Sequence, residues 1–110
     1  AIWLNAEQTE NGHRIEGKVP LDLVFLTDHF ADFPLVPGVV ELQWITDQIN
    51  EFLGFAPTIA RFEQLKFQKF LRPADRFQIQ LQWDAVKQRI KFQLLTEREV
   101  CCSGFALMER

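Results

Sequence analysis

The chain has 110 residues, a length that fits one hydrophobic core, so we expect a single domain spanning residues 1–110. Hydrophobic residues make up 47% and charged residues 25% of the sequence, which is ordinary for a globular protein. Twelve basic against fifteen acidic residues leave a net charge of −3, which argues against binding to nucleic acid. No apolar run approaches the roughly 20 residues that span a bilayer. Composition therefore favours a globular protein that binds neither nucleic acid nor membrane.

The first half of the chain contains two short strands, a loop and a helix. Residues 1–10 and 12–19 are expected to form strands on either side of the turn signal Asn11-Gly12. Three prolines lie between residues 20 and 37 and predict a structured loop. A helix is expected from Val39 to Leu53, because Pro37-Gly38 precedes it and Gly54 supplies a stop signal.

The predicted helix carries apolar residues on two sides, so we expect it to be enclosed by protein. At 100° per residue, one broad apolar face is formed by Val39, Leu42, Ile45, Ile49, Phe52 and Leu53. A second stripe contains Val40, Gln43, Trp44 and Asp47. Glu41 and Gln48 fall between the two.

After Pro57 the apolar period changes to two, which predicts four further strands, at residues 58–71, 75–84, 87–96 and 99–109. The alternation is plainest where Phe77, Ile79, Leu81 and Trp83 alternate with glutamines. Two strands, one long helix and four antiparallel strands give an α+β fold, with the helix against one face of a curved sheet. Cys101 and Cys102 are adjacent on the last strand, so we expect them to be reduced and the compartment to be the cytoplasm.

The segment from Asp28 to Val40 carries the residues with the clearest chemical potential. A helix beginning at Gly38 presents unpaired backbone N–H groups, and one of them could polarise a thioester oxygen. His29, on a loop among apolar residues, could act as a base toward an acidic C–H. The structural alternative is a packed loop histidine that bonds a backbone carbonyl. His13, next to the predicted Asn11-Gly12 turn, is expected to be solvated.

Two sequence blocks resemble the β-hydroxyacyl-[acyl carrier protein] dehydratases. His-Phe-x-x-x-Pro-x-x-Pro-Gly-Val, from His29 to Val39, is similar to the active-site signature of that family. The block from Lys66 to Asp75 resembles the family's K-F-x-x-P-V-x-P-G-D strand and turn, with Phe70 and Ala74 in place of its first Pro and its Gly. The likeness also extends to the small dehydratase-like proteins of aryl polyene gene clusters. It implies a hot-dog fold, in which an antiparallel sheet wraps around one long helix.

The resemblance also implies roles for individual residues. His29 would be the catalytic histidine, oriented by the carbonyl of Leu35, and Gly38 would supply the oxyanion-binding N–H. Pro37 and Val39 flank Gly38 and would help to bind the substrate. The family carries a carboxylate fourteen residues after the histidine, where this chain has Gln43, and a Gln one turn later, where it has Asp47.

Because the carboxylate and the amide have changed places at these two helix positions, a different residue would have to act as the acid. Residues four apart share a helix face, so Gln43 and Asp47 can hydrogen-bond and face the pocket together. We prefer Asp47 to Glu41 as a relocated acid, because Glu41 lies about 160° from Gln43 around the helix. The alternative is that Asp47 is simply an exposed helix residue.

These inferences predict an enzyme that removes water from a β-hydroxyacyl thioester of a carrier protein or coenzyme A. His29 would take the α-proton, Gln43 would hold the departing hydroxyl, and the proton would return from His29 or Asp47. We expect no metal and no cofactor beyond the phosphopantetheine arm of the substrate. The alternatives are a hot-dog thioesterase and a non-catalytic acyl-binding or partner subunit.

The resemblance further predicts self-association, because the family's active site forms where two protomers meet. We expect a homodimer, or a hetero-oligomer with another hot-dog chain. An acyl carrier protein is acidic and could meet four basic residues, Arg61, Lys66, Lys69 and Arg72, although strand alternation would divide them between two faces.

Overall fold

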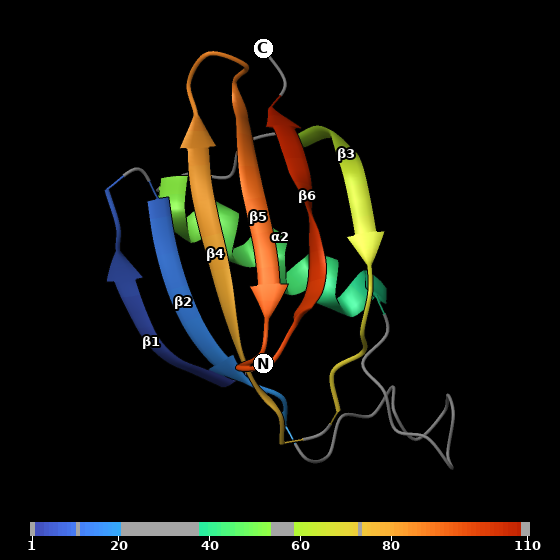
Figure 1. The fold of residues 1–110 in the computed structure, drawn as a ribbon. Coiled ribbons are helices and arrows are strands. Elements are labelled where there is room, and N and C mark those ends of the chain that lie inside the picture. Colours follow the sequence, from blue (N-terminus) through green and yellow to red (C-terminus); the bar gives the residue numbers. More distant parts are fainter. Residues whose placement is uncertain (1, 11, 21–37, 54–58, 73, 109–110) are drawn as a thin grey trace.

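The structure is a computed structural model, and it describes residues 2–10, 12–20, 38–53, 59–72 and 74–108. One helix and six strands lie within these ranges (Figure 1). In chain order they are β1 (Ile2–Gln8), β2 (Gly12–Lys18), α2 (Gly38–Leu53), β3 (Ile59–Phe67), β4 (Arg76–Asp84), β5 (Arg89–Leu95) and β6 (Val100–Met108). The predicted helix and all six predicted strands are confirmed, with strand ends that differ by a few residues.

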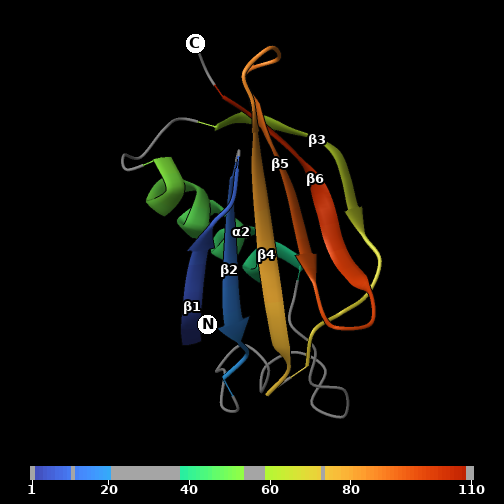
Figure 2. The same cartoon turned by 60° about the vertical axis from the view of Figure 1, so that its left-hand side comes forward.

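The six strands form one antiparallel sheet in the order β1-β2-β4-β5-β6-β3. β3 therefore pairs with β6, the third strand after it in the chain, and not with β4, the strand that follows it directly. The sheet curves, and α2 runs across its concave side (Figure 2). One layer of sheet on one helix is the α+β architecture that the sequence predicted.

Side chains on alternate positions of the central strands point at α2 and form the core. Ile79 of β4 faces Leu94 of β5, and Leu81 faces Phe92, so the apolar positions of the two strands coincide. Cys102 and Ala106 continue this layer onto β6. All these residues are buried. Each large apolar side chain buried in this way contributes about 1.5–3 kcal/mol, so this layer holds the sheet against the helix.

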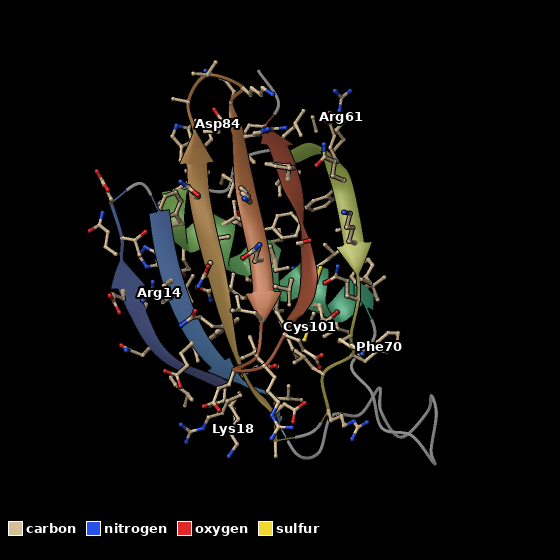
Figure 3. All side chains as sticks on the ribbon, viewed as in Figure 1. Arg14, Lys18, Arg61, Phe70, Asp84 and Cys101 are labelled. Atoms are coloured by element: carbon tan, nitrogen blue, oxygen red, sulfur yellow. The ribbon has the colours of Figure 1, made fainter. Side chains whose placement is uncertain are left out.

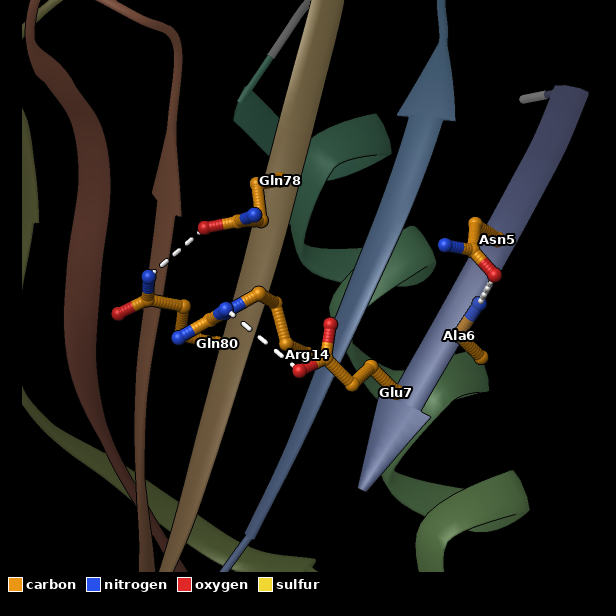
Figure 4. A network of polar contacts seen from close by, with 6 residues as sticks. All are labelled: Asn5, Ala6, Glu7, Arg14, Gln78 and Gln80. Carbon is orange, nitrogen blue, oxygen red and sulfur yellow. Dashed lines mark hydrogen bonds and ion pairs between the residues drawn. The ribbon is translucent and has the colours of Figure 1, made fainter. Parts of the chain in front are cut away.

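The opposite, convex face of the sheet is polar. Gln80 donates a hydrogen bond from Nε2 to Oε1 of Gln78 at 2.7 Å, and Arg14 lies 3.9 Å from the Glu7 carboxylate (Figure 4). On the edge strand, the Asn5 side chain accepts from the backbone N–H of Ala6. The Arg14–Glu7 ion pair is exposed, and a pair of this kind is worth about 0–1 kcal/mol. These polar contacts keep the face hydrated and contribute little to stability.

The register of edge strand β3 shifts between Glu63 and Lys66, where Gln64 adopts a left-handed φ of 52°. Gly104 on β6 lies beside this bulge, since a Cβ at that position would stand 3.0 Å from the Phe92 ring and 3.2 Å from the Glu63 carbonyl oxygen. Glycine therefore favours the close approach of the bulged strand to β6, because a larger residue would push the backbone of β3 or the Phe92 ring away by a few tenths of an ångström.

The orientation of α2 differs from the predicted one. The side chains buried against the sheet are those of Glu41, Trp44, Ile45, Gln48 and Ile49. Val39, predicted on the apolar face, is 74% exposed. The indole of Trp44 stacks on Phe77 of β4 with 5.4 Å between ring centroids and 2° between planes. This stacking turns the helix so that two polar residues lie inside and Val39 lies outside.

Candidate functional site

The start of α2 provides the donors of the candidate site. The helix begins at Gly38, so the N–H groups of its first turn have no partner within the helix. The Phe67 ring packs beside Gly38, because a Cβ built there would lie 2.9 Å from its Cε1 atom. Phe67 and Val39 are both partly exposed, so the apolar surroundings of this helix end open to solvent. A carbonyl oxygen placed here would meet N–H donors and the positive end of the helix dipole.

A methyl group at Gly38 should disturb this arrangement. We expect Gly38→Ala to displace the Phe67 ring by a few tenths of an ångström and to lower kcat/KM for acyl thioesters by about tenfold or more, since oxyanion donors act only at short range. Steady-state kinetics measures the effect. Circular dichroism should show an intact fold, because the contacted atom belongs to a side chain that can move. An unchanged kcat/KM would exclude close approach of a ligand to Gly38.

Gln43 and Asp47 form the predicted hydrogen-bonded pair on the exposed side of α2. Nε2 of Gln43 donates to Oδ1 of Asp47 at 2.9 Å. With its amide nitrogen held in this way, Gln43 presents its carbonyl oxygen as an acceptor. The pair can therefore accept a hydrogen bond from a hydroxyl, whereas a neutral amide cannot deliver a proton to it.

Glu41 lies in the first turn of α2, and the sequence had favoured Asp47 over it as the relocated acid. Its side chain is fully buried against the sheet, and neither carboxyl oxygen has a hydrogen-bond partner. Burial raises the pKa of this carboxyl from 4.5 to about 8, so it is mostly protonated at pH 7. The sequence did contain a signal for this burial. Glu41 and Gln48 are seven residues apart, so they share a helix face with Trp44 and Ile45.

The thiols of Cys101 and Cys102 on β6 are free, as predicted, and buried. Burial, followed by the nearby Glu41 carboxyl, raises the pKa of Cys101 to about 11 and that of Cys102 to about 12. Both thiols are therefore protonated and unreactive near neutral pH.

Three predicted site residues, His29, Leu35 and Pro37, lie outside the described residues. His13 was predicted to be solvated, and that prediction is wrong. It lies within β2, is only partly exposed, and meets Phe52 edge-on with 5.6 Å between ring centroids. Strand β2 extends to the hairpin turn, and its inward position 13 is covered by the end of α2.

Of the four basic residues considered for carrier binding, Arg61 lies near the start of β3, whereas Lys69 and Arg72 follow its end at Phe67. Figure 3 shows the separation of these two ends by the labels of Arg61 and Phe70. Arg61 forms an ion pair with Glu63 at 2.8 Å. Lys69 and Arg72 instead line a hollow of about 740 Å³ between the β3–β4 connection and the β5–β6 turn. Its other charged residues are Asp75, Arg76, Glu97, Arg98 and Glu99. The charge in this hollow is mixed.

Among the described residues, no three His, Cys, Asp or Glu side chains lie close enough to hold a metal ion. Within the same part of the chain, no helix has the length and apolar character needed to cross a membrane.

Solved structures with the same architecture identify the fold as a hot-dog fold. The dehydratase heterocomplex ApeI:P from Xenorhabdus doucetiae superposes with a TM-score of 0.86, at 24% identity, over 99% of this chain and 97% of that one. An (R)-hydratase from A. caviae involved in PHA biosynthesis gives a TM-score of 0.61 at 13% identity, over 91% of this chain and 96% of that one.

Sequence comparison places the chain within one family of this fold. The ApeI-like family, described as ApeI dehydratase, matches residues 5–105, and the chain belongs to it. A 3-hydroxyacyl-[acyl-carrier-protein] dehydratase, FabZ of Natranaerobius thermophilus, is 28% identical over 119 aligned positions, which cover 94% of this chain and 84% of that protein.

Proposed function

We propose that the chain removes water from β-hydroxyacyl thioesters, as a 3-hydroxyacyl-[acyl carrier protein] dehydratase-like lyase of fatty acid or aryl polyene synthesis. Membership of the ApeI-like dehydratase family carries this proposal. The start of α2 at Gly38, with free N–H groups beside the Phe67 ring, supports it.

In the proposed reaction, His29 removes the α-proton of the thioester and the Gly38 N–H stabilises the negative charge that forms on the thioester oxygen. The carbonyl oxygen of Leu35 orients His29, while Pro37 and Val39 border the thioester. The β-hydroxyl, held by Gln43, then leaves with one proton as water, and the α–β double bond forms. The thioester itself makes the α-carbon acidic, so the proposal requires no metal and no redox cofactor.

The source of the proton for water distinguishes this chain from relatives with a helix carboxylate. If Asp47 is the relocated acid, Asp47→Asn should lower kcat by about 10²-fold or more, with little change in KM. If His29 returns the proton, the same variant should stay within about threefold of wild type. Pre-steady-state measurement of water loss separates the two, and an unchanged rate removes Asp47 from the mechanism.

The proposed substrate carrier is an acyl carrier protein or coenzyme A, delivering the acyl chain on a phosphopantetheine arm. We further propose that the chain acts as a homodimer or together with another hot-dog chain. The second possibility is favoured by Gln43, which lacks the acid function, and by the similarity to a protein described as a dehydratase heterocomplex. In that case the chain would bind the acyl group while its partner supplied the missing carboxylate.

Mass spectrometry of the protein incubated with β-hydroxyacyl thioesters of several chain lengths tests the function directly. Loss of one water from the thioester is the expected result. Release of the free acid would indicate a thioesterase instead. Unchanged thioesters that nevertheless bind to the protein would indicate the partner-subunit role, and size-exclusion chromatography with light scattering would then establish its assembly.

A further inference from the structure

Glu41 is a buried ionisable group to which the proposed reaction gives no task. It is fully buried, and both carboxyl oxygens lack a hydrogen-bond partner. A buried polar group without a partner costs about 1–3 kcal/mol, and considerably more when it carries a charge. A leucine or methionine at this position would avoid that cost, so the carboxyl calls for a physical explanation.

Among the residues that the structure describes, no charged side chain would hold the Glu41 carboxylate. From β6 it faces the thiols of Cys101 and Cys102, which remain protonated to about pH 11 and 12. The buried inward positions of β4 and β5 are all apolar: Phe77, Ile79, Leu81, Ile90, Phe92 and Leu94. On β2, the inward-facing titratable residue is His13, which lies near the other end of α2 against Phe52. Within the described part of the chain, the partial positive charge of the helix N-terminus is therefore all that offsets the cost of ionising Glu41.

Glu41 also lies close to the proposed oxyanion site. It follows Gly38 by three residues on the same helix, a rise of about 4.5 Å along the axis. The helix terminus acts as roughly half a positive charge, and a full negative charge in the first turn outweighs it. Because the space between helix and sheet is apolar, water screens such a charge poorly.

We propose that Glu41 is a proton-controlled switch on the oxyanion-binding end of α2. When its carboxyl is protonated, the Gly38 amide and the helix dipole stabilise negative charge on the thioester oxygen without opposition. When the carboxyl is ionised, its charge opposes the enolate-like charge of the substrate and slows α-proton removal. This regulation rests on the proposed dehydratase function, and Glu41 acts through the helix end without touching the substrate.

The direction of the pH effect follows from the raised pKa of Glu41. With a pKa of about 8, the carboxyl is neutral below that pH and ionised above it, so kcat should fall as the pH rises through 8. His29 cannot produce this loss, since a histidine base only becomes more available as the pH rises. A unit charge several ångströms away, at an effective dielectric constant of about 20, should slow the reaction on the order of tenfold.

The test compares wild type with Glu41→Gln, which keeps shape and polarity but cannot ionise. Glu51→Gln is the matched control, because it makes the same change at an exposed position of the same helix. Between pH 6 and 9.5, kcat should fall on the order of tenfold in wild type and in the control but stay level in Glu41→Gln. Below pH 7 all three should have the same kcat. A fall in Glu41→Gln that matches wild type would overturn the proposal.

A second measurement separates the switch from a proton-donor role and from unfolding. Deuterium incorporation at the α-carbon of a saturated acyl-CoA needs the base and the oxyanion site but no acid. It should show the same fall above pH 8 in wild type and none in Glu41→Gln, with the circular dichroism spectrum unchanged. A fall in dehydration without a fall in exchange, or one that follows loss of the spectrum, would overturn the switch. Wild type that neither dehydrates nor exchanges would refute the proposed function, and the switch with it.

Discussion

His29→Ala should lower the rate of dehydration by about 10²–10⁴-fold, because the proposed mechanism has no other base for the α-proton. The resemblance of residues 29–39 to the family signature predicts that His29 is the catalytic base. The loss should be in kcat rather than in KM, since the imidazole acts on the transition state more than on substrate binding. Mass spectrometry of the β-hydroxyacyl and enoyl thioesters measures both forms in one sample.

The control for this prediction is His13→Ala, which removes the other histidine of the chain. Its ring packs against Phe52, away from Gly38, so the variant should lose some stability and keep its rate per folded molecule. Equal rates in wild type and His29→Ala would rule out the proposed mechanism. Retained binding of a non-hydrolysable acyl thioester by His29→Ala would confirm that the variant is still folded.

Glu41→Met should stabilise the protein, and by more at high pH than at low pH. Methionine fills a similar volume without a polar group, so it removes both the unpartnered oxygens and the cost of ionisation. The pKa of Glu41 is about 8 in the folded protein and 4.5 when unfolded, so the folded state binds the extra proton between these values. The stability of wild type is therefore highest below pH 4.5 with respect to this group and falls as the pH approaches 8.

Each pH unit across that interval costs wild type up to about 1.4 kcal/mol, which Glu41→Met should not lose. Urea denaturation at pH 5, 6.5 and 8 measures the free energy of unfolding of both proteins. The difference between them should increase steadily over this series. Glu51→Met, at an exposed position of the same helix, should leave the pH dependence of wild type unchanged. Parallel curves for wild type and Glu41→Met would mean that Glu41 is ionised, and therefore compensated, in the folded state.

The sequence by itself was sufficient for the number, type and order of the described elements. Pro37-Gly38 and Gly54 enclose the helix, because neither residue type continues a helix readily. The alternation of Phe77, Ile79 and Leu81 with glutamines identified both a strand and its inward face, and these three side chains are buried. Such signals are local, so they can be recognised without knowing what the segment packs against.

Part of the candidate site could likewise be predicted from local features of the sequence. The Gln43–Asp47 hydrogen bond follows from the four-residue spacing on a helix, and the structure contains it. The free N–H groups at Gly38 follow from the position of the helix start. The roles of His29, Leu35 and Pro37 rest on the family signature and remain predictions.

Only the tertiary structure decided which side of α2 faces inward. The apolar stripe from Val39 to Leu53 suggested one orientation, yet Val39 is exposed while Glu41 and Gln48 are buried. The stacking of Trp44 on Phe77 and the curvature of the sheet set the rotation, and both depend on residues distant in sequence. The pairing of β3 with β6 likewise depends on contacts between residues distant in sequence. The bulge of β3 lies close to Gly104 of β6, where the absence of a side chain leaves space for it. Periodicity records how apolar residues are spaced within a segment, whereas the energy of burying a particular face depends on the surface that it meets.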